Sequence, residues 1–389
     1  LIGGARVSGK VGTSDIGVLN MQTESLGTLH ANNFTVARFK QELPNRSNLG
    51  AILVNRQGTG DLAPEDDYNR TFALDGKLGY GKSGQVAGIF AQSFTPGVNS
   101  KRHAFKIGTT YDVPSFSISA NFTEVANFFN PEVGFLQRRQ GPFRNTIGEP
   151  QPGGYRKPDG LVLFRLRPKN FMGIQELRPH VSYRGYWDFN DFQVSGFLHV
   201  DNHWEWKSGH EIHSGVNFTR EGVFTEFEIF PGIKVPTGTY DNRELMLVFI
   251  TNPGAWWSLE SRWTMGGYFS GNRVSVGNTA KIRLGEALNT EVGWTRNDIN
   301  LPQGDFITNL IRWRLSYSFT PRLFLQSLLQ FNDRADLRST NLRFGWLQSA
   351  NTGLFVVYTE TNGWDDADPR LPSDRQLTLK YSRLFDVLQ

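Results

Sequence analysis

Residues 307–319 read ITNLIRWRLSYSF, and this stretch sets the expected fold of the chain. One alternate set of side chains is apolar: Ile307, Ile311, Trp313, Leu315, Tyr317 and Phe319. The set between them is polar: Thr308, Arg312, Arg314, Ser316 and Ser318. Two residues break the pattern, because Asn309 is polar at an apolar position and Leu310 is apolar at a polar position. A period of two places the two sets on opposite faces of a β-strand. The pattern therefore predicts a strand well beyond the roughly 5–6 residues of an average soluble one.

The same alternation recurs along the whole chain. It is clearest in residues 71–80, 105–113, 116–123, 192–206, 212–219, 274–284 and 342–346. We count about 21 such segments of about 9–15 residues, and a strand needs roughly 9–11 residues to cross a bilayer. Lipid tolerates no open sheet edge, so such strands must close into a cylinder. The sequence predicts an all-β protein, in which residues 1–389 form a single large antiparallel transmembrane β-barrel of about 20–22 strands, integral to a bacterial outer membrane.

Composition narrows the function classes. The 389 residues include no cysteine, which excludes disulfides and thiolate metal sites. Lys and Arg total 41 against 37 Asp and Glu, and this balance of +4 gives no basis for binding nucleic acid. No run of about 18 apolar residues could form a membrane-spanning helix. The expected partners are outer-membrane lipid and lipopolysaccharide, with a periplasmic or surface protein as a further candidate.

Short turns alternate with longer connections, as they do in outer-membrane barrels. Longer loops are expected near residues 57–69, 221–241 and 297–305, among others. If short and long connections alternate in this way along the whole chain, the first and last strands run in the same direction. Barrels of this type instead close through antiparallel neighbours. We therefore expect either that a strand upstream of Leu1 is missing from this sequence or that our count is wrong by one.

Eight basic residues fall on the polar faces that are expected to line the lumen: Lys77, Lys106, Arg262, Lys281, Arg283, Arg312, Arg314 and Arg343. In an open lumen they would raise the local concentration of anions. The alternative is that they pair with lumenal Asp and Glu, and we expect this of most of them.

The longest irregular segment spans about residues 124–160. It contains Arg138, Arg139 and Arg144, together with several Gly and Pro residues. Side chains alone cannot fill the interior of a barrel of this size. The segment is therefore a candidate plug of the lumen, and a long outer loop is the equally open alternative.

One cluster could ligate a metal. His199, Asp201, His203 and Glu205 lie on one predicted lumenal face, with His213 across the hairpin, and imidazole with carboxylate can hold a divalent cation. Spacing by two residues sets such side chains about 7 Å apart, which favours an ordinary polar wall. The acidic residues Glu65, Asp66 and Asp67 could likewise bind Ca²⁺ or simply be solvated loop charge. No nucleotide-binding, hydrolase or metalloprotease motif is present, so neither enzymatic activity nor another cofactor is expected.

Eight short motifs in order resemble one known family: GGARVSGKVG (3–12), NFTVAR (33–38), RSNLGAILVNR (46–56), FNPEVGFLQR (129–138), TGTYDN (237–242), LPQGDF (301–306), TNLRFGW (340–346) and LFVVYTE (354–360). The resemblance is to bacterial outer-membrane barrels that have a C-terminal domain of unknown function. Their members often carry an N-terminal domain similar to family-nine carbohydrate-binding modules, which is absent here. The resemblance implies a barrel in the outer membrane, and it supplies no catalytic residue.

The expected function is a channel or transport conduit for small or oligomeric solutes. One alternative is a structural scaffold that anchors a periplasmic or surface partner. A second alternative is a soluble all-β carbohydrate-binding protein, and a lumenal enzyme is the least supported.

Overall fold

One antiparallel sheet accounts for most of the molecule. The computed structural model describes residues 1–134, 153–349, 352–363 and 373–383. Within these ranges, no helix is long and apolar enough to cross a membrane. The sheet has 21 strands, each paired with the next along the chain, and they range from 9 to 17 residues.

The strands have the following bounds. The first half of the sheet consists of β1 (Gly3–Val11), β2 (Ser14–Gln22), β3 (Ala31–Leu43), β4 (Ser47–Thr59), β5 (Tyr68–Tyr80), β6 (Gly84–Phe94), β7 (His103–Val113), β8 (Phe116–Val125), β9 (Tyr155–Phe164), β10 (Ile174–Trp187) and β11 (Gln193–Trp206). The second half consists of β12 (Glu211–Val223), β15 (Gly238–Ile250), β16 (Trp257–Tyr268), β17 (Gly271–Leu284), β18 (Leu288–Leu301), β19 (Gly304–Thr320), β20 (Leu323–Asn332), β21 (Leu337–Ser349), β22 (Thr352–Gly363) and β23 (Ser373–Ser382). A separate hairpin is formed by β13 (Phe227–Phe230) and β14 (Ile233–Val235).

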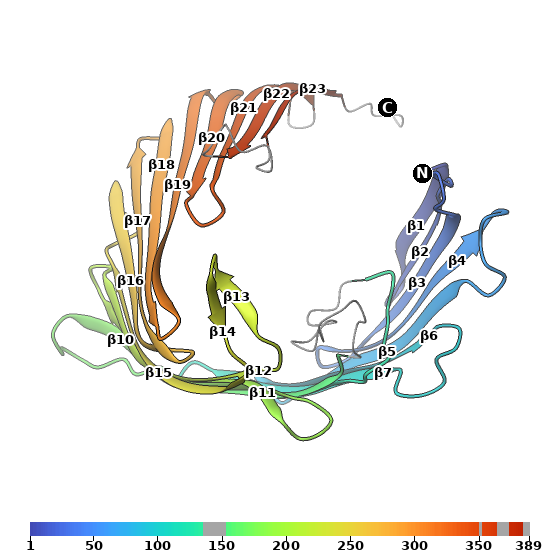
Figure 1. The fold of residues 1–389 in the computed structure, drawn as a ribbon, viewed down its shortest axis with the longest axis horizontal. Helices are drawn as coiled ribbons and strands as arrows, with labels where there is room; N and C mark the ends of the chain where they lie inside the picture. The colour runs from blue at the N-terminus through green and yellow to red at the C-terminus, as the bar shows by residue number, and fades with distance from the viewer. Residues whose placement is uncertain (135–152, 350–351, 364–372, 384–389) are drawn as a thin grey trace.

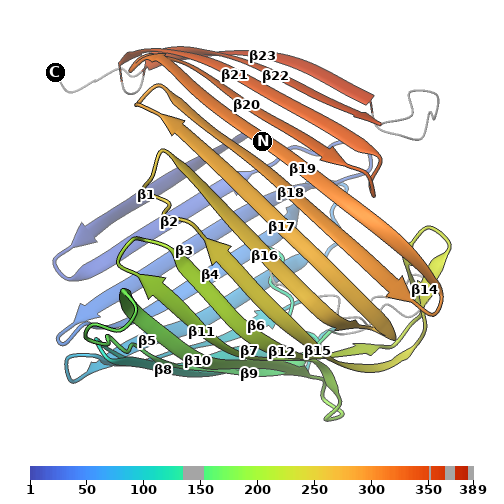
Figure 2. The same cartoon turned by 90° about the vertical axis from the view of Figure 1, so that its left-hand side faces the viewer.

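The sheet curls into a cylinder with one open seam. Figure 1 shows the ring end on, with β1 and β23 on either side of the seam, and Figure 2 shows the tilted strands from the side. Among the described residues, β1 pairs with β2 and β23 pairs with β22, and the two edges do not pair with each other. Because 21 is odd, β1 and β23 run in the same direction. The predicted all-β barrel fold is confirmed, whereas the additional upstream strand stays a prediction.

Contacts inside the ring identify the inner face of the sheet. The β13–β14 hairpin lies within the ring and packs on Ile299, Leu301 and Phe306. Alternate residues of β19 therefore face outward, among them Ile307 and Trp313, each 43% exposed. Large apolar side chains are exposed in the same way on nearly every strand. A continuous apolar outer surface is what a lipid bilayer requires, and it contradicts the alternative of a soluble carbohydrate-binding protein.

Aromatic residues gather at one end of the outer surface. Trp257 begins β16 directly after a turn, and Tyr317 and Trp346 lie close to the turns that end β19 and β21. All three are exposed. All three residues lie at the same end of the strands, so the aromatic band marks one membrane interface, where amphipathic rings are favoured.

One predicted loop is wrong. The connection expected over residues 297–305 is a turn of only Pro302 and Gln303, since β18 ends at Leu301 and β19 begins at Gly304. Polar and turn-forming residues suggested a loop, but the apolar residues among them pack under the β13–β14 hairpin and keep both strands regular. The segment predicted over 124–160 is also shorter, because β8 extends to Val125 and β9 begins at Tyr155.

Candidate functional site

The inner wall of the barrel carries the polar chemistry of the chain. Two pieces of chain lie inside the ring at the same end of the strands: residues 126–134, which follow β8, and the β13–β14 hairpin (Figure 1). Between them, the wall displays a basic surface on β16–β21 and a histidine cluster on β10–β12.

The segment after β8 docks on the inner wall through a small apolar cluster. Phe129 packs against Ala73 and Ala91, whose small side chains leave room for its ring, and against Val125. All four are buried. Burying a phenylalanine side chain contributes roughly 1.5–3 kcal/mol, so this contact holds the start of the segment against β5 and β6.

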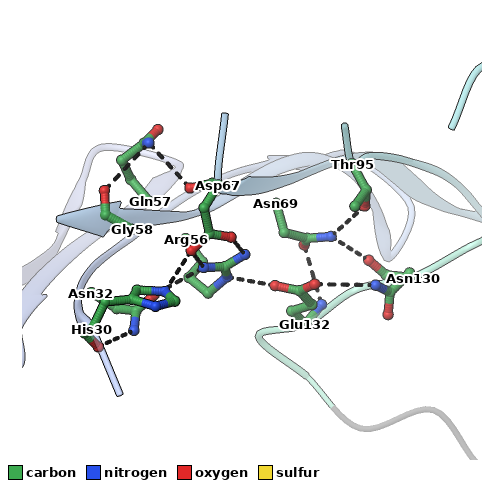
Figure 3. Close-up of polar contacts among 10 residues, drawn as sticks. All are labelled: His30, Asn32, Arg56, Gln57, Gly58, Asp67, Asn69, Thr95, Asn130 and Glu132. Atoms are coloured by element: carbon green, nitrogen blue, oxygen red, sulfur yellow. Dashed lines mark hydrogen bonds and ion pairs between the residues drawn. The ribbon is translucent and has the colours of Figure 1, made fainter. Parts of the chain in front are cut away.

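Hydrogen bonds then fix the backbone of the same segment, as Figure 3 shows. Asn69 is almost fully buried, and its Nδ2 donates to the carbonyl oxygen of Asn130 at 2.7 Å. The Oδ1 of Asn69 accepts from the backbone N–H of Glu132 at 3.2 Å. The Oγ of Ser93 accepts from the backbone N–H of Asn130 at 2.9 Å. Where the chain leaves the sheet, backbone N–H and C=O groups thus form hydrogen bonds with side chains of the inner wall.

An ion network adds to this docking. The guanidinium of Arg56 donates to both Asp67 and Glu132 (Figure 3). The hydrogen bonds from Arg56 hold the pKa of the Asp67 carboxyl below its usual range, and His30 adds to the effect. Arg56 and Glu132 belong to two of the motifs quoted above, so residues far apart in the sequence meet at one point. Asp67 is thus bound to cationic partners, which disfavours the Ca²⁺ alternative for this loop.

The basic surface centres on Glu291. Its carboxylate is shared by Lys281 at 3.5 Å, Arg312 at 3.2 Å and Arg314 at 3.5 Å. The register of β17, β18 and β19 places all four on the inner face, because it continues the alternation of Ile299 and Phe306. One carboxylate facing three cations leaves a local excess of positive charge.

The other predicted lumenal cations differ in their partners. Arg262 lies 3.4 Å from Glu260, and Arg343 stacks over the ring of Phe355 at 4.7 Å. In the described ranges, no ion pair involves Lys77, Lys106 or Arg283. Lys77 and Lys106 line a cavity of about 380 Å³ on the opposite wall. Half of the eight predicted residues are therefore paired with a carboxylate, fewer than the sequence led us to expect.

The structure brings histidines from three strands around Asp201. His180 on β10 is the cross-strand partner of Asp201, and His203 Nε2 lies 3.0 Å from the Asp201 carboxylate. His199 Nε2 lies 3.5 Å from the same oxygen. The side chain of Asp201 has no solvent exposure, and in the part of the chain described neither carboxylate oxygen has a well-directed hydrogen-bond donor.

Two of these imidazoles are oriented by neighbours. His199 Nδ1 lies 2.7 Å from Asn217 Oδ1, and His180 Nδ1 lies 3.0 Å from the carbonyl oxygen of Arg178. Both contacts require the histidine to donate from Nδ1, because each partner oxygen can only accept. The Nε2 atom of each neutral ring then carries a lone pair. His203 stacks on His213 with ring centroids 3.6 Å apart.

The residues that could share a metal ion differ from those predicted. Glu205 instead binds Arg178 at 2.9 Å. The ligand atoms that lie within 4.8 Å of one another belong to His180, Asp201 and His203, so His199 is also outside this group, although its Nε2 lies 3.5 Å from Asp201. The expected separation of about 7 Å along one strand did not allow for the reach of the imidazole, because His203 Nε2 lies 3.0 Å from the Asp201 carboxylate. Sequence reasoning missed His180, since its strand contains Pro179 and alternates poorly. Arg138, Arg139 and Arg144 lie outside the described residues, so the plug alternative stays a prediction.

Comparison with solved structures supports the barrel fold. No family model and no curated protein matches the chain. The solved structures that are similar include a variant of the ferric enterobactin receptor PfeA from Pseudomonas aeruginosa, with a TM-score of 0.50, 9% identity, and coverage of 94% of this chain and 71% of that one. The ferric preacinetobactin receptor BauA from Acinetobacter baumannii has a TM-score of 0.47, 8% identity, and coverage of 97% and 70%.

The curled antiparallel sheet, its apolar exterior and its polar interior together define the class of protein. The chain is an integral outer-membrane β-barrel. The PfeA structure is a receptor by its title, and at 9% identity it bears on the fold alone.

Proposed function

We propose that this barrel is a conduit for anionic solutes across the outer membrane. The observation that supports the proposal is the surplus of cations on the inner wall, where, among the described residues, Glu291 is the one carboxylate paired with Lys281, Arg312 and Arg314. Cations that line a water-filled path raise the local concentration of anions and lower the barrier to their passage. Lys77 and Lys106 add positive charge on the opposite wall, beside a carboxylate, Asp75, that Arg38 already occupies.

Conductance across planar bilayers tests this proposal. Purified protein in a KCl gradient should give a reversal potential that reports selectivity for Cl⁻ over K⁺. The double variant Arg312→Gln and Arg314→Gln should reduce that selectivity, because it removes two of the three cations around Glu291. Arg296→Gln is the matched control, since Arg296 lies on the outer face of β18 and pairs with Asp298. A silent or cation-selective barrel would defeat the proposal.

Anchoring of a partner is a second candidate function. The outer edges of β1 and β23, which have no partner strand among the described residues, favour it. An exposed edge presents unpaired backbone N–H and C=O groups to any additional strand. Cross-linking in outer-membrane vesicles, followed by mass spectrometry of the bands that contain β1 or β23, would identify a stable partner. If only the barrel itself is recovered, the scaffold alternative fails.

We further propose that the chain belongs to the barrel family that its motifs resemble. The ion pair between Arg56 and Glu132 supports this, because it joins two of the eight motifs in space. A sequence search with related barrels should find the two residues changing together, and independent variation of the pair would count against membership.

A further inference from the structure

The histidine cluster on the inner wall has the composition of a metal site. His180, Asp201 and His203 each offer one ligand atom, and these atoms all lie within 4.8 Å of one another. Nitrogen and oxygen ligands bind a transition-metal ion at about 2.0–2.2 Å, which places any two of them at most about 4.4 Å apart. Small side-chain rotations would therefore bring the three donors onto one ion.

The charge balance of the cluster also calls for a cation. Asp201 is buried, and its carboxylate lacks a well-directed donor among the described residues. The rings of His180 and His199 are held by their Nδ1 atoms, so their Nε2 lone pairs are left without a proton when the rings are neutral. A buried carboxylate without a well-directed hydrogen-bond donor is costly. A bound cation would satisfy the carboxylate and the lone pairs together.

The surrounding residues support the ligands in the way that metal sites require. The Nδ1–H of His180 donates to a backbone carbonyl, and that of His199 donates to Asn217. Asn217 Nδ2 faces Glu244 Oε2 at 3.5 Å, which orients the amide so that its Oδ1 points at His199. Such contacts fix the tautomer and the ring orientation of a ligating histidine. Gly215 on β12 leaves the space that the Asp201 side chain occupies.

We propose that His180, Asp201 and His203 bind a divalent transition-metal ion on the inner wall of the barrel, with His199 as a further donor. Two imidazoles and a carboxylate suit Zn²⁺, Ni²⁺, Co²⁺ or Cu²⁺ and select against Mg²⁺ and Ca²⁺, which prefer oxygen ligands alone. The site is distinct from the basic surface on β16–β21. Its test does not depend on whether the barrel conducts.

Metal titration of the purified, chelator-treated barrel tests the proposal. Calorimetry with Zn²⁺ should give one site per chain, and Co²⁺ should give a visible absorption band from nitrogen and oxygen ligands. His203→Ala should weaken Zn²⁺ binding by at least about 100-fold, the upper end of what losing a mere supporting contact costs. His180→Gln is a second variant that keeps a polar side chain. Far-ultraviolet circular dichroism should show that both variants retain the strand content of the wild type.

His210→Ala is the matched control, because His210 lies in the turn between β11 and β12. It should bind Zn²⁺ like the wild type. The proposal is overturned if the wild-type barrel binds none of the four metals. It is equally overturned if both folded variants bind as tightly as the wild type does.

Discussion

At the scale of single residues, Gly215 makes the histidine cluster geometrically possible. It is the cross-strand partner of Asp201, and a Cβ added to it would lie 3.0 Å from both Cβ and Cγ of Asp201. We predict that Gly215→Ala displaces the carboxylate, weakens Zn²⁺ binding about 10-fold and lowers the free energy of unfolding by about 1–3 kcal/mol, the usual cost of overpacking. Zn²⁺ titration and denaturant-induced unfolding of the same sample measure both effects.

Gly277→Ala provides the control for that substitution. Gly277 also lies on the inner face of a strand, but the nearest atom to an added Cβ would be Thr295 Oγ1 at 3.8 Å, an ordinary contact. Both properties should therefore stay at wild-type values in this variant. Unchanged Zn²⁺ affinity in Gly215→Ala would contradict the prediction that the added Cβ displaces the Asp201 carboxylate from the metal.

At the scale of elements, the β13–β14 hairpin is an obstruction built into the lumen. Val235 is fully buried, and the hairpin packs on Ile299, Leu301 and Phe306. Val223 and Gly238 form the last pair of β12 and β15, so an Asn-Gly turn can replace residues 224–237 without changing the register. We predict that this replacement increases single-channel conductance in planar bilayers, because it removes backbone from the interior of the ring.

The matched control is Lys234→Gln. Lys234 lies in the hairpin but is exposed, and within the described ranges its one ion pair is with Glu226. The substitution should leave the hairpin in place and the conductance close to that of the wild type. A replacement variant that folds and conducts no better would show that the hairpin does not limit passage.

The strands could be predicted from the sequence, whereas the folded connections and the histidine cluster could not. Alternation of apolar and polar residues predicted most of the strands, because a bilayer on one side and a polar lumen on the other favour it. It did not predict which connections pack on the inner wall, because Phe129 and Val235 are buried there against residues that are distant in the sequence. The His180–Asp201 contact was likewise out of reach, because it depends on the register between β10 and β11, which no single strand encodes.

At the scale of the whole molecule, the described residues leave a seam between β1 and β23. β1 and β23 run in the same direction, so antiparallel closure would need an odd number of further strands between them. The chain has no cysteine, which allows the seam to be probed with introduced pairs. A disulfide requires Cα atoms closer than about 7 Å, and β1 and β23 lie on either side of the seam (Figure 1). We therefore predict that Ser8→Cys forms no disulfide when combined with Asp374→Cys, Thr378→Cys or Ser382→Cys.

The control pair joins two neighbours within the sheet. Ser275 and Asn297 are cross-strand partners whose side chains lie 2.7 Å apart, so Ser275→Cys with Asn297→Cys should oxidise readily. Electrophoresis with and without reductant distinguishes the outcomes. If any β1–β23 pair forms a disulfide as readily as this control, the two edges meet directly. The cylinder would then close through parallel strands, and the seam would not be a feature of the folded barrel.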